Sequence, residues 1–397
     1  MKNENSSNKP IGLLYDSVNN NTGDKAIGVA LSDYLGLRKI SHQIVDPFSF
    51  SVDEFEFLIV GGGLLLRDEG DDFYDCFRLK GNHALMAMGT FVSKNIDYLN
   101  EYKKVSVRSE ADKNRLLEID PELQVEVVPC ITLTMKKPEV LPVDVKNTIG
   151  IHFVADTLQN CTDFEKIINS LPGKKAVLPF TFYNHDSNLM KKANLVGDYI
   201  YLDEYDPKTI FGLIGEMSAV VVSSLHATIF AYANGIPFLT YYQDKVQEFL
   251  DDRNLGHLSF RNSEELKEKL HFLEYSGEGI PFEESLKNDV KKIDKFFDEL
   301  LSDIPENKDY SKSSYELEEL STEAQLKRSK LDSSLLQVVV AHRDDLIGNL
   351  IQRNVISQID IENIKTELEL RDRTLSAKLM RLERRLKNFI SKRLLRR

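Results

Sequence analysis

A histidine, two serines and a lysine lie within one stretch of the chain, Ala219–Lys245. Ala219–Val222 predicts a buried strand, Ser223 and Ser224 a turn, and the residues after them a helix that leads to a second short strand, Pro237–Thr240. His226 falls at the start of this helix, where backbone N–H groups lack partners and the helix dipole is positive. The pattern favours an anion site with a proton carrier beside it. The alternative is that His226 is only a helix cap or a residue at the edge of the core.

A polar loop follows the first apolar run of the chain. Ile11–Tyr15 predicts a strand, and a helical pattern begins at Lys25. Asn21, Gly23 and Asp24 lie where the loop enters that helix, so they are candidates for lining a site at the end of the strand. The alternative is that Asp24 is a helix N-cap.

Three consecutive glycines, Gly61, Gly62 and Gly63, follow the predicted buried strand Phe57–Val60. Glycines after a strand let the backbone approach a ligand and offer N–H groups to an anion or a sugar hydroxyl. Their spacing differs from the dinucleotide fingerprint, and no Gly-Lys-Ser/Thr follows them as in a P-loop. They therefore indicate either a ligand-facing loop or a turn of purely conformational purpose.

Charged residues also follow two other predicted strands. Arg108 and Ser109 come directly after Lys104–Val107, where an arginine is well placed to grip a carboxylate or phosphate bidentately. The alternative for Arg108 is a salt bridge with the acidic surface. His185 and Asp186 lie in the loop after a predicted strand that ends at Leu178, so they too are candidates for lining a site.

Strands alternate with helices through most of the chain, which predicts doubly wound parallel sheets. The predicted domains are residues 11–135 and 148–301, separated by a linker at 136–147, after a disordered N-terminus at 1–10. A helix is predicted over Asn82–Val92. The further predicted elements are helices at Ala111–Leu117, Asp163–Ser170, Pro207–Glu216, Ser263–Phe272 and Glu283–Leu301, and strands at Val125–Val128, Thr148–Phe153, Lys175–Leu178 and Tyr199–Leu202.

The charge of the chain is unevenly distributed. The 397 residues carry a net charge of −12, but the final 27 hold eleven Lys and Arg against two acidic residues, which leaves the first 370 at −21. The negative charge of residues 1–370 argues against binding of nucleic acid by this part of the chain. Cys76, Cys130 and Cys161 show no metal-ligand spacing, and three cysteines cannot all pair, which favours a reducing compartment. No run approaches 18 apolar residues, and the polar N-terminus lacks the apolar run typical of a signal sequence, so we expect a cytoplasmic protein.

The C-terminal part has a different composition. Residues 302–314 predict a linker, and apolar residues from Ile361 to Phe389 then recur at steps of mostly three and four, which predicts a helical extension over 315–397. Such a stripe fits a coiled coil that joins copies of the chain, or a helix folded back on the body. A third interpretation is a basic amphipathic helix over 371–397 that lies on the inner face of an anionic membrane.

Taken in order, these motifs resemble the polysaccharide pyruvyl transferase family over residues 11–300. The resemblance is carried by Asn21-Thr22-Gly23-Asp24, Val60-Gly61-Gly62-Gly63-Leu64, Val107-Arg108-Ser109, Leu178-Pro179-Phe180 with Asp186, Ser223-Ser224-Leu225-His226-Ala227, Ala231, Gly235-Ile236-Pro237 and Asp244-Lys245. It implies two Rossmann-like domains that face a cleft, as in GT-B glycosyltransferases. It also implies transfer of a pyruvyl group from phosphoenolpyruvate, as a ketal, onto a sugar of a cell-surface glycan precursor.

The resemblance further implies the role of each residue. The chemistry requires a general acid, a base and cations for the donor's carboxylate and phosphate, but no metal and no redox cofactor. His226 would be the general acid/base, Arg108 and Lys245 the anion holders with Ser109, and the Ser223-Ser224 turn a supplementary anion nest. The residues expected to line the acceptor side of the cleft are Asn21, Gly23, Asp24, Gly61, Gly62, Gly63, His185 and Asp186.

Two positions differ from the family pattern. Ser224 stands where many members carry an arginine, and Cys130 stands where an acidic residue is common. Either the donor is held differently or the donor is not phosphoenolpyruvate. Two other functions therefore stay open: a glycosyltransferase with a nucleotide-sugar donor, and a non-catalytic glycan-binding or scaffolding protein that assembles through its C-terminal helices.

Overall fold

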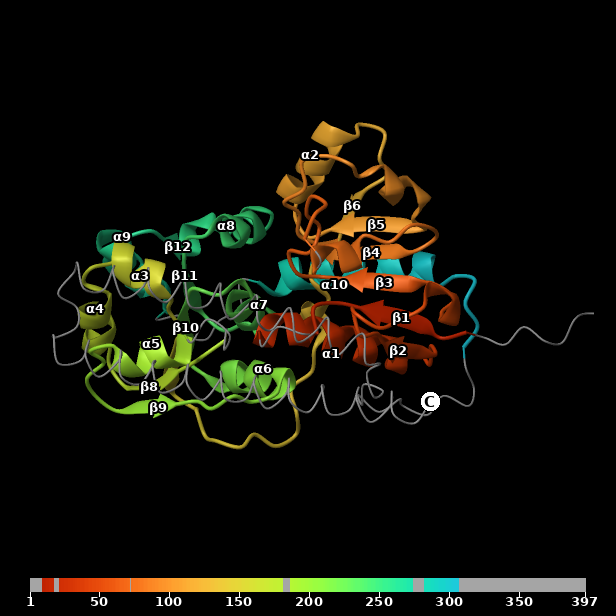
Figure 1. Cartoon of the computed structure of the whole chain (residues 1–397). Helices are drawn as coiled ribbons and strands as arrows, with labels where there is room; N and C mark the ends of the chain where they lie inside the picture. Colours follow the sequence, from red (N-terminus) through yellow and green to blue (C-terminus); the bar gives the residue numbers. More distant parts are fainter. Residues whose placement is uncertain (1–8, 18–20, 72, 181–185, 274–281, 307–397) are drawn as a thin grey trace, which may run out of the picture. The chain divides into compact units, whose positions relative to one another are not determined.

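The computed structural model describes residues 9–17, 21–71, 73–180, 186–273 and 282–306. Two parallel six-stranded sheets lie within the described residues, both inside one compact unit, residues 1–333. We call the part built on the first sheet the N-lobe (residues 9–135) and the part built on the second sheet the C-lobe (residues 145–273). In Figure 1 the N-lobe sheet is red to orange and the C-lobe sheet is yellow to green. The predictions for residues 1–8 and for the C-terminal extension lie outside the described residues.

The N-lobe sheet has the strand order β2-β1-β3-β4-β5-β6, and every neighbouring pair is parallel. The central strands are apolar and buried on both faces, as expected of a sheet that helices cover on both sides. The strands are β1 (Ile11–Leu14), β2 (His42–Ile44), β3 (Leu58–Gly61), β4 (Ala84–Met88), β5 (Lys104–Val107) and β6 (Glu126–Val127).

The C-lobe sheet has the order β12-β11-β10-β7-β8-β9, again wholly parallel. Its strands are β7 (Thr148–Ile151), β8 (Lys174–Val177), β9 (Tyr199–Tyr201), β10 (Ala219–Val222), β11 (Phe238–Tyr241) and β12 (Ser259–Phe260). The predicted fold class, two Rossmann-like doubly wound domains in a GT-B-like arrangement, is confirmed for the described residues.

Strand order reverses direction at one point in each sheet. In the N-lobe this switch point lies between β1 and β3, and in the C-lobe between β7 and β10. Open α/β sheets bind ligands outside the carboxyl ends of their strands at such points, because the loops there diverge to opposite faces. Asn21–Asp24, Gly61–Gly63 and His226 lie at or after the carboxyl ends of three of these four strands.

Helices alternate with the strands along most of the described chain. The α-helices are α1 (Thr22–Leu37), α2 (Glu110–Ile119), α3 (Ala155–Asn160), α4 (Phe164–Ser170), α5 (Asp186–Lys192), α6 (Pro207–Glu216), α7 (Leu225–Ala233), α8 (Asp244–Asp251), α9 (Ser263–Lys269) and α10 (Glu283–Leu300). Short 3-10 helices also occur, of which η4 (Ile131–Thr134) packs against both α1 and α7.

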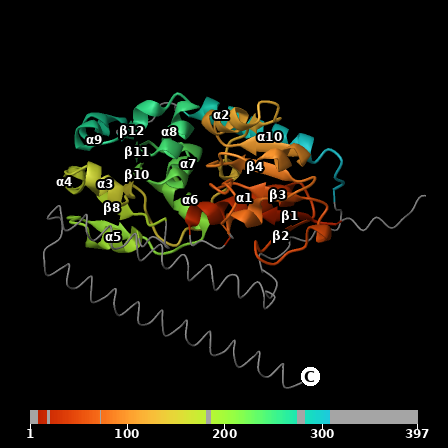
Figure 2. The same cartoon turned by 45° about the horizontal axis from the view of Figure 1, so that its top comes forward.

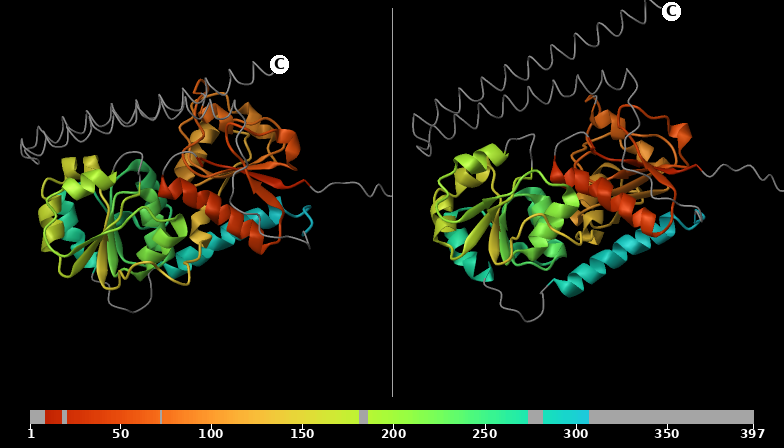
Figure 3. Two further views of the ribbon diagram at one scale, coloured as in Figure 1. Left: turned by 60° about the horizontal axis from the view of Figure 1, so that its bottom comes forward. Right: turned by 90° about the horizontal axis from the view of Figure 1, so that it is seen from below.

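Helix α10 joins the two lobes. Near its start Asp289 forms a buried ion pair with Arg253 of the C-lobe (Nε–Oδ2 2.8 Å). Further along, Asp294 accepts a hydrogen bond from Tyr34 and Glu299 pairs with Lys104, both in the N-lobe. Figures 2 and 3 show α10 in cyan alongside the N-lobe. The helix therefore adds contacts that oppose separation of the lobes.

One predicted element is wrong. The helix expected over Asn82–Val92 is the strand β4, whose five residues are all buried. A short apolar run buried on every side carries no period that distinguishes a strand from a helix segment. His83, at the edge of this strand, is also buried, and its Nδ1 accepts the backbone N–H of Leu58 at 3.2 Å.

Candidate active site at the meeting of the lobes

His226 lies where the two lobes touch. Strand β10 is fully buried, and α7 begins directly after the turn, so His226 occupies the first turn of that helix. The N-terminus of α1 in the N-lobe packs against it so closely that a Cβ at Gly23 would overlap the imidazole. A backbone bond from Thr22 N–H to the Phe180 carbonyl (3.0 Å) fixes the same junction. Gly23 is therefore required by close approach to His226.

The surroundings of His226 disfavour its charged form. Desolvation by the surrounding protein, followed by the positive charges of Lys245 and Arg108, lowers its pKa to about 3. The imidazole is therefore neutral near pH 7. A neutral ring has one nitrogen that donates and one that accepts, so His226 can take a proton or present a hydrogen bond.

Asp24 stands on the N-lobe side of the same cluster. Desolvation and the charge of Asp16 raise its pKa to about 7, against the opposing effects of Lys245 and Arg108. Such a carboxyl exchanges its proton near neutral pH, which suits acid–base chemistry. The helix cap is Asn21, whose Oδ1 accepts from Gly23 N–H (2.8 Å) and Asp24 N–H (3.4 Å), so the alternative that Asp24 is the N-cap is wrong. Because Asn21 caps the helix, the Asp24 carboxyl is not used for that purpose.

The three glycines serve mainly to bring the chain close to α1. Gly62 and Gly63 have φ values of +63° and +72°, in the region that favours glycine. A Cβ on Gly61 would lie 2.7 Å from Leu31, and one on Gly62 would overlap Ile27. Gly63 alone of the three approaches the cluster, since a Cβ there would lie 3.5 Å from Asp24 Oδ1. Close packing therefore accounts for Gly61 and Gly62, and Gly63 borders the site.

Arg108 leaves the carboxyl end of β5 and contributes to the pKa shifts of His226, Asp24 and Lys245. Its guanidinium packs on Gly89 so tightly that a Cβ there would overlap it. Its Nε lies 3.4 Å from Asp112 Oδ2, an ion pair without hydrogen-bond geometry. The carboxylate of Asp112 thus balances the positive charge of Arg108 and lies next to the Nε end of its guanidinium group.

Lys245 enters from the C-lobe, in the first turn of α8. Desolvation and the charge of Arg108 lower its pKa, and Asp24 opposes that change. Lys245 is nevertheless exposed, and both Asp24 and His226 are only half-buried. Water therefore reaches part of each of these three side chains, although the protein around them still desolvates their ionisable groups.

Cys130 borders the same cluster where the family commonly has an acidic residue. Its Sγ lies 3.9 Å from His226 Nε2 and 3.2 Å from Thr132 Oγ1. Burial raises the pKa of the thiol, although the bond to Thr132 opposes this. The side chain next to His226 is therefore neutral at physiological pH, which leaves Asp24 as the acidic group of the cluster.

Several predicted site residues have side chains engaged elsewhere. Ser109 is the N-cap of α2 and bonds Asp112, and Ser223 is buried with its Oγ 2.7 Å from Thr157 Oγ1. Ser224 occupies the N-cap position of α7 through its backbone carbonyl, which accepts from Thr228 N–H at 3.0 Å, and its side chain forms no capping hydrogen bond. Asp186 is buried, accepts from Phe180 N–H (2.8 Å) and faces His152 Nε2 at 3.4 Å. His185 lies outside the described residues.

Three residues with a part in this region were not predicted. Asp16, which follows β1 and is buried, helps to raise the pKa of Asp24. Asp112 and Glu248 bond the segments that carry Arg108 and Lys245. Asp112 completes a Ser-x-x-Asp pattern that is typical of a helix start, which is a signal visible in the sequence. Glu248 has no such signal, because its partner lies 133 residues away.

Two further observations apply to the described residues. They contain no group of three side chains that could hold a metal ion. None of their helices combines the length and apolar character needed to cross a membrane.

The family model for polysaccharide pyruvyl transferase matches residues 21–245, more than half of the chain. The match begins at Asn21 and ends at Lys245, so it contains His226, Arg108 and Asp24. The chain belongs to the polysaccharide pyruvyl transferase family. A search of curated proteins found no match.

Solved structures resemble this chain at the level of fold. A protein described as a UDP-N-acetylglucosamine 2-epimerase from Listeria monocytogenes is 12% identical, covers 77% of this chain and 100% of its own, and has a TM-score of 0.48. The UDP-GlcNAc 2-epimerase from Methanocaldococcus jannaschii is 12% identical, with 72% and 99% covered and a TM-score of 0.43. A functionally uncharacterised protein from Klebsiella pneumoniae is 14% identical, with 63% and 90% covered and a TM-score of 0.40. Likeness of this degree carries no inference about substrate.

Gly23→Ala tests the contact between Gly23 and His226. The added methyl group overlaps the imidazole, so the ring must turn or the helices must separate. We expect turnover to fall on the order of 100-fold, since small displacements of catalytic groups have effects of that size. The overpacking should also cost about 1–3 kcal/mol of stability. Enzyme assays and thermal melts would measure both, with Lys25→Ala on the same turn as the control. Unchanged turnover would contradict the assigned contact.

Proposed function

We propose that the chain transfers a pyruvyl group from phosphoenolpyruvate onto two hydroxyls of a sugar, forming a ketal in a cell-surface glycan precursor. The observation that carries this proposal is the cluster of Arg108, Lys245, His226 and Asp24, which unites two cations and two proton carriers from both lobes. Family membership supports the same reaction class.

Arg108 and Lys245 would bind the donor. Phosphoenolpyruvate carries a carboxylate and a phosphate on one short carbon frame, and two cations from opposite sides suit that charge distribution. Their mutual proximity is unfavourable in the absence of an anion: after desolvation, the charge of Arg108 is the second cause that lowers the pKa of Lys245. An anion between them removes that repulsion. The cationic pair thus supports donor binding even though Ser224 replaces the arginine common in the family.

His226 would deliver the proton that starts the reaction. Desolvation is the largest cause of the low pKa of His226, and the charges of Lys245 and Arg108 lower it further. A donor bound between these two cations offsets their contribution, so binding raises the pKa of His226. The resulting imidazolium protonates the methylene carbon of the enol phosphate, which leaves an oxocarbenium-like centre at the neighbouring carbon. That centre accepts the first sugar hydroxyl.

Asp24 would serve the acceptor. As a carboxylate it takes the proton of the attacking hydroxyl, and a pKa of about 7 suits this role at neutral pH. Phosphate then leaves with the electrons of its C–O bond, and the second hydroxyl attacks the same carbon. Two protons leave the hydroxyls and one enters the methyl group. The net products are the ketal and hydrogen phosphate.

A direct assay tests the proposal. The full chain would be incubated with phosphoenolpyruvate and a panel of lipid-linked and nucleotide-linked sugars, and products would be analysed by mass spectrometry for the ketal and by colorimetry for phosphate. Ketal formation that requires phosphoenolpyruvate is the expected result. Thermal shifts would compare phosphoenolpyruvate with uridine diphosphate. Stabilisation by the nucleotide alone, with no ketal from any acceptor, would contradict the proposal.

Anion binding should take up protons. An anion next to His226 and Asp24 favours the protonated form of each, so both pKa values rise on binding. Affinity for sulfate, which does not itself titrate near neutral pH, should therefore increase as the pH falls from about 8 to about 6, the range around the pKa of Asp24. Calorimetry in buffers of different ionisation enthalpy would count the protons. Asp24→Asn should remove most of the uptake, and a pH-independent affinity would contradict the coupling.

A further inference from the structure

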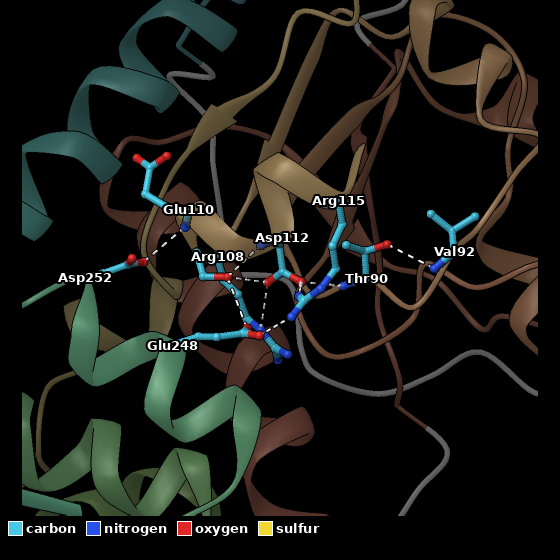
Figure 4. Close-up of polar contacts among 9 residues, drawn as sticks. Thr90, Val92, Arg108, Glu110, Asp112, Arg115, Glu248 and Asp252 are labelled. Atoms are coloured by element: carbon cyan, nitrogen blue, oxygen red, sulfur yellow. Dashed lines mark hydrogen bonds and ion pairs between the residues drawn. The ribbon is translucent and has the colours of Figure 1, made fainter. Parts of the chain in front are cut away.

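A network of charged and polar groups joins α2 of the N-lobe to α8 of the C-lobe (Figure 4). Arg115 on α2 pairs with Glu248 on α8 through Nη2 and Oε1. The second oxygen of Glu248 lies 3.3 Å from Ser109 Oγ, whose single hydroxyl proton has a nearer acceptor in Asp112 Oδ2 at 2.8 Å. One turn along α8, Asp252 Oδ2 accepts the backbone N–H of Glu110 at 3.2 Å. These contacts hold the start of α2 against one face of α8.

Asp112 is the centre of this network. It is fully buried and bonds Arg115 Nη1 (2.8 Å), Ser109 Oγ (2.8 Å) and the backbone N–H of Thr90 (3.0 Å). The same carboxylate lies 3.4 Å from Arg108 Nε. A buried charge with this many partners has one stable arrangement, because breaking any contact leaves a charge or donor unpaired. The side chains of Arg108 and Arg115 are therefore tied to one fixed point.

The network adjoins both cations of the donor site. Ser109 is the next residue after Arg108, and Glu248 follows Lys245 by three residues on α8. Residues three apart lie on the same face of a helix, so the face that presents Lys245 to the site also presents Glu248 to the N-lobe. Whatever fixes Glu248 against Ser109 and Arg115 also fixes the separation of Lys245 from Arg108.

We propose that Glu248 is a positioning residue, which holds Lys245 opposite Arg108 at the separation that binds one anion with both a carboxylate and a phosphate group. Desolvation is the largest cause of the lowered pKa of Lys245, and the charge of Arg108 lowers it further because the two cations repel one another. The contacts of Glu248 offset this repulsion before the anion binds. The site is thereby preorganised, and binding does not have to bring the cations together. This inference rests on the proposed donor role of Arg108 and Lys245.

Glu248→Gln in the full chain is the test. The amide keeps the shape but loses the charge that pairs with Arg115, and lost charge-assisted bonds of this kind correspond to about tenfold or more in affinity. We expect about tenfold weaker binding of inorganic sulfate and of phosphoenolpyruvate by calorimetry. In turnover assays the KM for the donor should rise about tenfold while kcat changes less than threefold, since saturating donor restores the arrangement. General destabilisation would not produce this split.

Two control variants and one double-mutant cycle complete the experiment. Asp33→Asn breaks another ion pair between the lobes, that of α1 with Lys208 on α6. Glu283→Gln breaks an exposed pair within α10. Both should leave sulfate affinity within twofold of the wild type. Arg115→Gln should weaken sulfate binding as Glu248→Gln does, and the double variant should be no weaker than either single one. If Glu248→Gln does not fold, Arg115→Lys gives the same measurement, because a single ammonium cannot serve both Asp112 and Glu248.

Sulfate binding separates the outcomes. Glu248-dependent sulfate binding without any pyruvyl transfer would retain the positioning role and reject the proposed reaction. Pyruvyl transfer with an unchanged donor KM and sulfate affinity in Glu248→Gln would reject the positioning role and retain the reaction. A wild-type chain that binds neither sulfate nor phosphoenolpyruvate would overturn the inference as well.

Discussion

Replacing His226 by Gln is expected to lower the rate of pyruvyl transfer by about 10²- to 10⁴-fold, the usual contribution of a general acid or base. The substitution removes the proton carrier but leaves the charge of the site unchanged, because a pKa of about 3 keeps His226 neutral at physiological pH. Arg108 and Lys245 remain in place, so donor binding should change only a few-fold. The expected result is thus a loss in kcat with a nearly constant KM.

The measurement is a steady-state assay with the best acceptor of the panel, accompanied by sulfate calorimetry. His257→Gln is a suitable control, since this histidine is exposed and its ring stacks only on Phe272 among the ring contacts of the described residues. A His226→Gln chain with at least a tenth of the wild-type rate would show that His226 does not carry the proton. Loss of sulfate binding in the same variant would instead indicate that His226 belongs to the anion site.

Regular elements with clear boundaries in the sequence were predicted closely. Strand β10 and helix α6 have the predicted bounds, Ala219–Val222 and Pro207–Glu216. The helix begins with an Asp-Pro pair, which supplies a cap and a fixed first turn, and Asp206 indeed accepts from Lys208 and Thr209 N–H. Residues next to each boundary determine where the element begins, so these boundaries could be predicted from the sequence.

Elements whose stability depends on their neighbours were missed. β2 and β12 are edge strands of three and two residues, too short to show alternation. Helix α8 was not predicted. It follows β11 almost directly, and the sequence pattern indicated only an anion-binding role for Lys245 in its first turn. These elements exist because a sheet edge or a lobe surface lies beside them, which single-segment patterns do not reveal.

The same distinction applies to the site. Residues that follow the carboxyl ends of strands, such as Arg108 after β5 and His226 after β10, were predictable because the parallel strands of a sheet bring their carboxyl ends to one edge. The partners of those residues were harder to assign. Ser109 and Ser223 have the composition of an anion site, yet their hydroxyls bond Asp112 and Thr157. The side-chain type alone does not tell which way a hydroxyl points when several acceptors are near.

Asp24 and His226 should make opposite contributions to the pH dependence of stability. The folded pKa of Asp24, about 7, lies above its ordinary value of 3.8, so between these values the folded chain holds a proton that the unfolded chain has lost. Stability from this group therefore falls as the pH rises through that window. The folded pKa of His226, about 3, lies below 6.5, so here the unfolded chain holds the extra proton and stability rises with pH. Between about pH 4 and pH 6.5 the two slopes oppose one another.

Single substitutions should separate the contributions of Asp24 and His226 to the pH dependence of stability. Asp24→Asn removes the falling contribution, so its melting temperature relative to the wild type should increase from about pH 4 to about pH 7. His226→Gln removes the rising contribution, so its relative melting temperature should decrease from about pH 4 to about pH 6.5. Because Asp24 is partly exposed, solvent screens its charge, and we expect an effect on the order of 2 kcal/mol rather than the full shift.

Scanning calorimetry of the three full-length chains across this pH range would measure the differences. Comparing each variant with the wild type at the same pH cancels the contribution of all other titrating groups. Parallel profiles for the two variants would contradict the assignment of opposite pKa shifts. Opposite profiles would show that the site destabilises the folded chain at both ends of the range, through an ionised Asp24 at high pH and a histidine held neutral at low pH. Asp24→Asn should then gain stability at neutral pH while losing turnover, as expected where burial of an acid serves catalysis.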